Sequence, residues 1–89
     1  MDLLVGRVLE VNDHPGSRGP SYLVTVDLGG RGTREAQMEP GEYDKDQLTG
    51  TFVVVSLDDD QAIVLAARSH SGPLLVRPDG DAEPGTPVA

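Results

Sequence analysis

The feature that most constrains the fold of this chain is a series of short apolar runs, each bounded by glycine or proline. The runs are rich in Val, Leu and Ile, and they have the length and composition typical of β-strands. Eleven Gly and seven Pro among 89 residues stay below the fraction of about 25–30% that is typical of low-complexity chains. We therefore predict a turn-rich, all-β domain that occupies residues 1–89.

Three strands are predicted in the first half of the chain. The first covers residues 3–11 and ends at a turn that contains Pro15. Residues 22–28 alternate, with Tyr22, Val24, Val26 and Leu28 on one face and Thr25 and Asp27 on the other. Glycines at positions 29, 30 and 32 supply the backbone freedom of a hairpin turn, after which residues 33–38 form the third strand.

The second half of the chain is predicted to contain one helical turn and further strands. Residues 43–48 close into the helical turn, with Gly50 as its left-handed cap. Residues 51–57 are apolar on both faces and predict a central strand. Residues 61–67 predict another strand, although their Ala and Leu content leaves helix as the alternative. Residues 74–76 predict a last strand and residues 79–89 a surface tail, so the whole suggests a small closed or partly open barrel.

The composition excludes several classes of function. A net charge of −8 repels a polyanion at long range, so nucleic acid is not the default partner. The absence of Cys excludes disulfides, thiolate zinc sites and a thiol nucleophile. No apolar run reaches the ~18 residues of a membrane span, and no signal segment is evident, so we expect a cytoplasmic protein that does not contact a membrane. A chain of this length is also poorly suited to the deep cleft of an enzyme.

Several short motifs carry a resemblance to a known family. They are Val5-Gly6-Arg7-Val8, His14-Pro15, residues 22–29, Ala36-Gln37-Met38, Tyr43 with Leu48 and Gly50, and Pro78 with Pro84-Gly85 and Val88. Their order and spacing resemble the tRNA-binding domain found in CsaA-like stand-alone proteins and at the C-terminus of some methionyl-tRNA synthetases. The resemblance implies a five-stranded OB-fold barrel. It also implies a non-catalytic module without a cofactor, which binds tRNA or other structured RNA through backbone and shape contacts.

The chain departs from that family in its charged positions. Members of the family carry a basic, RNA-contacting loop after the fourth strand, whereas this chain has Asp58-Asp59-Asp60. Glu35 stands where the family often has a small polar residue. The first strand begins close to Met1, so we expect no N-terminal helix of the kind that helps some stand-alone members to dimerise.

The candidate RNA-binding residues are Arg31, Arg34 and Gln37, followed by Arg18 and Arg68. Arg31 and Arg34 share one predicted hairpin and can form a small basic spot, although dispersed solubilising charge explains the arginines equally well. Tyr22 and Phe52 are expected in the core, which leaves few aromatic side chains for base stacking.

Other readings remain open at this point. The acidic features favour an alternative function, in which a degenerate barrel has lost RNA binding and serves as a protein-binding or homodimerisation module. The three aspartates could hold a metal, but successive side chains point in different directions, and we expect a solvated turn without metal. His14 and His70 lack a neighbouring Ser or carboxylate in a triad-like arrangement, so structural roles are expected for both. A small-molecule site in the barrel mouth has no motif to support it.

Overall fold

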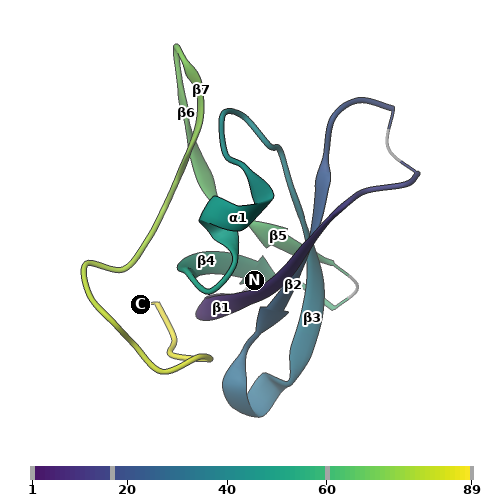
Figure 1. Cartoon of the computed structure of the whole chain (residues 1–89). Helices are drawn as coiled ribbons and strands as arrows, with labels where there is room; N and C mark the ends of the chain where they lie inside the picture. Colours follow the sequence, from purple (N-terminus) through teal and green to yellow (C-terminus); the bar gives the residue numbers. More distant parts are fainter. Residues whose placement is uncertain (1, 17, 60, 89) are drawn as a thin grey trace.

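The chain folds into a closed five-stranded barrel (Figure 1). The computed structural model describes residues 2–16, 18–59 and 61–88. Around the barrel the order is β1 (Asp2–Asp13), β2 (Tyr22–Asp27), β3 (Thr33–Met38), β5 (Ala62–Val64) and β4 (Phe52–Leu57). The β3–β5 pair is parallel and the others are antiparallel. This architecture confirms the predicted all-β, OB-type barrel.

The strand β1 closes the barrel because it pairs on both of its edges. Its first half, residues 2–7, pairs with β4, and its second half, residues 7–13, pairs with β2. The register shifts between Val8 and Glu10, so Leu9 is the extra residue of a β-bulge and its side chain is 48% exposed. A bulge bends its strand and increases the local twist. The bend therefore lets one strand reach both neighbours.

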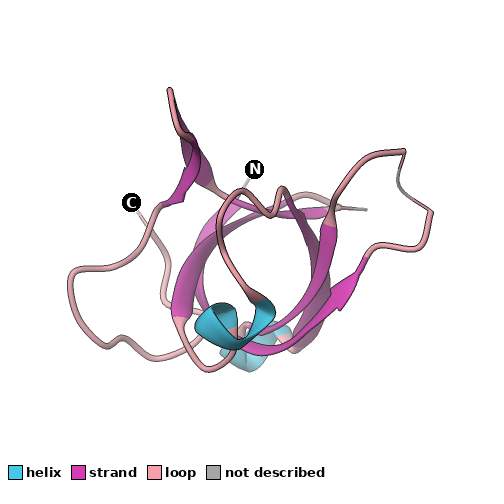
Figure 2. Ribbon diagram, turned by 45° about the horizontal axis from the view of Figure 1, so that its top comes forward, coloured by secondary structure: helices cyan, strands magenta, loops and turns pink. Residues whose placement is uncertain are grey.

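The core fills the interior of the barrel and is closed at one end by a helical turn. The predicted alternation in β2 is confirmed, because Val24, Val26 and Leu28 are fully buried. The predicted helical turn is also confirmed as α1 (Lys45–Leu48), which lies across one opening of the strand ring in Figure 2. Leu48 of α1 is fully buried in the core. Gly50 follows with a positive φ of 83°, as expected of the residue that ends the turn.

The predicted strand over residues 61–67 is wrong as a single element. It divides at Leu65 into β5, which belongs to the barrel, and β6 (Ala66–Ser69), which pairs with β7 (Gly72–Leu75) in a separate hairpin. The Leu65 N–H donates to Val54 O in β4, and Leu65 O accepts from the Val76 N–H, which follows β7. Leu65 is therefore the residue at which the chain passes from the barrel into the hairpin. The residues of β6 are all exposed, and the hairpin projects away from the barrel (Figure 1).

The expectation that Phe52 is a core residue is wrong. The inward positions of β4 are Val53, Val55 and Leu57, which belong to the buried cluster. Phe52 is only half-buried at the start of the strand, where it pairs with Arg7 of β1. It therefore lies on the outer face of the barrel, because side chains alternate along a strand.

The segment beyond Pro78 is hydrogen-bonded to the barrel over its last residues. The Gly85 N–H donates to Val5 O at 2.7 Å, and the Val5 N–H donates to Thr86 O at 2.8 Å. Gly85 has a φ of +90°, and a Cβ atom there would collide with Leu28 O at the end of β2. The segment expected as a surface tail therefore pairs with residues 3–5 of β1, on the edge that β2 covers only from Arg7 onward.

The close packing at Gly6 predicts a measurable cost for one added methyl group. A Cβ atom at Gly6 would overlap Val26 Cγ1 and lie 2.9 Å from Leu28 Cδ2. We expect Gly6→Ala to lower the free energy of unfolding by about 1–3 kcal/mol, because both neighbours are fully buried and cannot move freely. Urea denaturation measures this change. Gly30→Ala is the control, since a Cβ atom there meets nothing within 4 Å, and an equal loss in both variants would contradict the packing argument.

Candidate nucleic-acid interface

The hairpin formed by β2 and β3 carries two of the candidate arginines. A 3-10 turn, η1 (Gly29–Arg31), links the strands, and the Gly29 N–H donates to Asp27 Oδ1 at 2.9 Å. Arg31 therefore lies in the turn, while Arg34 lies in β3 opposite Val26. Both residues are exposed and line the same depression at this end of the barrel.

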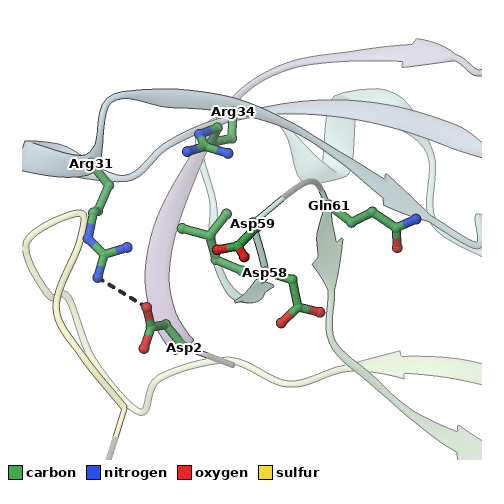
Figure 3. Close-up of a pocket in the computed structure, with 7 residues that line it drawn as sticks. Asp2, Arg31, Arg34, Asp58, Asp59 and Gln61 are labelled. Carbon is green, nitrogen blue, oxygen red and sulfur yellow. Dashed lines mark hydrogen bonds and ion pairs between the residues drawn. The ribbon is translucent and has the colours of Figure 1, made fainter.

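A depression of about 600 Å³ lies between this turn and the β4–β5 connection. In Figure 3, Arg31 and Arg34 lie on the β2–β3 side and Asp2 and Asp59 lie across from them, whereas the carboxylate of Asp58, which also lines the depression, points away from both arginines. Arg31 Nη2 lies 3.1 Å from Asp2 Oδ2, in an ion pair whose side chains are about half exposed. Asp60 of the predicted acidic turn lies outside the described residues. Three described carboxylates and two guanidinium groups thus line this depression.

A second depression, of about 310 Å³, lies on the outer face of β2, β3 and β5. Its lining residues are His14, Leu23, Glu35, Gln37, Gln61, Ala62 and Ile63. In the strand register Gln37 pairs with Leu23 on one side and with Ile63 on the other. Gln61 also lines the first depression, and in Figure 3 its side chain extends away from Arg31 and Arg34. The two depressions therefore adjoin at Gln61.

A third depression, of about 450 Å³, continues the second, with which it shares Gln37 and Ile63. Arg68 of β6 and Pro73 of β7 line its far side. We call the three adjoining depressions the barrel groove. Four of the five candidate residues lie along it, with Arg31 and Arg34 at one end, Gln37 in the middle and Arg68 at the other end. Arg18 lies instead in the exposed β1–β2 connection.

Sequence reasoning missed three polar residues of the barrel groove. His14 was expected to have only a structural role, Glu35 was noted only as a departure from the family, and Gln61 was not singled out. The signal for Glu35 was present, because it alternates with Ala36 and so shares the outer face of β3 with Gln37. His14 and Gln61 come from the connections on either side of that face, and only the closed barrel brings them together.

The two tyrosines support the fold beside the groove. The Tyr22 O–H donates to Tyr43 O at 2.9 Å, and the Leu75 N–H of β7 donates to Tyr43 Oη at 3.1 Å. Both rings pack against the core, as expected for Tyr22. The Arg77 guanidinium lies 6.0 Å from the Tyr43 ring centroid, within the range of a cation–π contact. These rings therefore anchor the β6–β7 hairpin instead of forming a base-stacking platform.

Two further properties concern only the part of the chain that the structure describes. Over residues 2–16, 18–59 and 61–88, no group of three or more His, Asp or Glu side chains is arranged to hold a metal ion. The described helices are too short to cross a membrane.

Relatives of this chain match it along almost its whole length. A methionine–tRNA ligase from Thermococcus kodakarensis is 30% identical over 97 residues, which cover 99% of this chain and 13% of that ligase. A CsaA chaperone protein from Picrophilus torridus has a TM-score of 0.87 and 26% identity, over 99% of this chain and 91% of that chain. These homologues, a segment of methionine–tRNA ligases and the CsaA proteins, are consistent with a CsaA-like tRNA-binding domain family.

Further comparisons concern the fold, the protein-family models and the length of the relatives. The CsaA chaperone from Bacillus anthracis shares the fold, with a TM-score of 0.88 at 19% identity over 99% of this chain and 90% of that one. No protein-family model matches the chain. The chain spans only a small part of the curated ligases that it matches, 13% of each. The matched stretch of the ligase, 97 residues, is longer than the 89-residue chain, so at least one connection is shorter here.

The exposed ion pair of the first depression is expected to contribute little to stability. Asp2→Asn should change the free energy of unfolding by less than about 1 kcal/mol, because exposed ion pairs are screened by water and salt. Urea denaturation of the variant and the parent chain measures the difference. A loss of several kcal/mol would contradict this expectation, whereas a small change means that a ligand can separate Arg31 from Asp2 at little cost.

Proposed function

We propose that this chain is a non-catalytic module that binds unpaired segments of structured RNA, tRNA first, along the barrel groove. The observation that carries the proposal is the position of the groove. Its second depression lies on the outer face of β2 and β3 beside the β1–β2 and β4–β5 connections, which is the face that OB folds use for oligonucleotides. Its first depression adjoins that face at one end of the barrel. The homology to a segment of methionine–tRNA ligases supports tRNA as the first RNA to test.

The charges along the groove support contacts to an RNA backbone at its two ends. Arg31 and Arg34 at one end and Arg68 at the other can each hold a phosphate, since guanidinium groups pair well with phosphate oxygens. OB folds hold about 4–16 nucleotides, depending on the protein. A short single-stranded segment is therefore the ligand that suits this surface, and its affinity should fall steeply as salt is added.

The proposed role is binding, and any chemistry belongs to a partner. The groove offers amide, imidazole, carboxylate and guanidinium groups at its surface, which suit hydrogen bonding to bases and phosphates. A tRNA-binding role also implies a cytoplasmic location, where tRNA is aminoacylated.

A second candidate function is protein binding, and the exposed apolar residues favour it. Ile63 is 46% exposed beside the groove, Leu74 is 51% exposed on β7, and Val76 is 41% exposed just after β7. Together with the net charge of −8, they would suit a protein partner or a second copy of the chain. Sedimentation of the chain alone tests for a second copy, and sedimentation with tRNA tests for the RNA complex.

The RNA proposal predicts a specific role for Arg34. Arg34→Gln should weaken binding of labelled tRNA by roughly five-fold, or ~1 kcal/mol, because one charge-assisted phosphate contact is lost. The slope of log K against log salt should also fall by about 0.7–0.9. Titrations at several salt concentrations measure both quantities.

Arg77→Gln is the matched control for Arg34→Gln, because it removes the same charge next to Tyr43. If Arg34→Gln and Arg77→Gln lose the same affinity for tRNA, the binding depends on the net charge of the chain and not on contacts in the barrel groove. If the parent chain fails to bind tRNA even at low salt, the RNA proposal is wrong and protein binding becomes the better candidate.

The carboxylates opposite the arginines predict a change in the other direction. The double variant Asp58→Asn, Asp59→Asn should bind tRNA more tightly, by roughly three- to ten-fold at low salt, because two charges that repel phosphate are removed beside Arg31 and Arg34. The gain should shrink at high salt. Asp79→Asn, Asp81→Asn makes the same charge change in the C-terminal segment, and an equal gain there would show that only net charge matters.

A further inference from the structure

We propose that the second depression of the barrel groove binds an unpaired guanine base, read by the carboxylate of Glu35. The inference rests on the proposed RNA-binding function and adds the identity of the base. Glu35 extends from the outer face of β3 into this depression, next to Gln37 on the same face and Gln61 on the β4–β5 connection. The depression thus places one carboxylate and two amide groups around a single space.

The size and walls of this depression suit a planar base. Its volume of about 310 Å³ lies at the lower end of the ~300–1,000 Å³ of small-molecule sites. Leu23 and Ile63 supply apolar walls on the neighbouring strands β2 and β5, and the side chain of Ile63 is 46% exposed. A base that stacks against these side chains would cover apolar surface now in contact with water.

Glu35 sets the identity of the base through its hydrogen-bonding capacity. An ionised carboxylate only accepts hydrogen bonds, and its two oxygens can accept from two adjacent donors. Guanine presents N1–H and N2–H₂ side by side on its Watson–Crick edge. Adenine, cytosine and uracil each place an acceptor beside their donor on that edge, so a carboxylate oxygen would face an acceptor. Glu35 therefore favours guanine and disfavours the other three bases.

The two glutamines complete the recognition. Each amide offers both donors and an acceptor, so an N–H₂ group of Gln37 or Gln61 can donate to guanine O6, which is the acceptor next to N1–H. Gln61 also borders the depression that holds Arg34, and Gln37 borders the one that holds Arg68. The phosphates on either side of the bound nucleotide would thus lie toward the arginines at the two ends of the groove.

The test uses short RNAs that differ in one base. Labelled pentamers of uridine that carry guanine, inosine or adenine at the central position are titrated against the parent chain and against Glu35→Gln. We expect the parent chain to bind the guanine pentamer about ten-fold or more tightly than the adenine pentamer, as a bidentate base contact provides. Inosine should fall between them, because it keeps N1–H and lacks the N2 amino group.

Glu35→Gln should lose the preference for guanine while its affinity for the all-uridine pentamer is kept or improved. Glu10→Gln is the matched control. It removes the same charge from β1, one strand beyond Thr25, which pairs with Glu35, and it should keep the preference. Circular dichroism confirms that both variants fold.

The outcomes separate this inference from the proposed function. If the parent chain binds all pentamers equally, or if Glu35→Gln keeps the guanine preference, the guanine site is wrong and RNA binding stands. If the parent chain binds no pentamer and no tRNA, the RNA-binding proposal fails and the guanine site fails with it.

Discussion

The pairing of β1 with both β2 and β4 is the constraint on which the rest of this structure depends. One strand can serve two neighbours only because it bends at the bulge of Leu9, and because Gly6 leaves room for Val26 and Leu28 beneath it. Without that bend the sheet would remain open, with unpaired backbone groups along two edges. Closure is what brings the β1–β2 and β4–β5 connections to the two sides of one face, and the barrel groove lies between them.

Much of the barrel could be predicted from the sequence because its signals are local. The alternation of residues 22–28 reports burial directly, and the glycines after Leu28 and at Gly50 report backbone conformation. The division at Leu65 could not be predicted in this way. Residues 62–67 are uniformly apolar, and the point at which the chain leaves the sheet depends on the long-range bonds of Leu65 to Val54 and Val76. Such long-range pairing has no local signature.

The sequence indicated which arginines lie at the candidate site, but it did not indicate that Asp2 lies opposite them. Because Arg31 and Arg34 lie close together in the sequence, a predicted hairpin was enough to place both of them at the same end of the strand pair. Asp2 is far from both along the chain, and its position opposite Arg31 follows only from barrel closure. The acidic turn was recognised in the sequence as a change from the basic loop of the family. Asp58 and Asp59 of that turn line the same depression as Arg31 and Arg34, which is the surface that would receive phosphate in the proposed complex.

The charges along the barrel groove influence whether it would bind RNA mainly through the phosphate backbone or mainly through the bases. A strongly basic OB surface binds any nucleic acid through its backbone, and this term is independent of sequence. Here the described carboxylates offset much of that attraction, so the affinity for non-cognate RNA is expected to be low. In the proposed complex, contacts to base edges would be weakened less than contacts to phosphates, because they are short-ranged and would form within the depression that holds Glu35, Gln37 and Gln61. Reduced backbone attraction therefore raises the share of the binding energy that distinguishes one RNA from another, which is the property that a site for a single unpaired base requires.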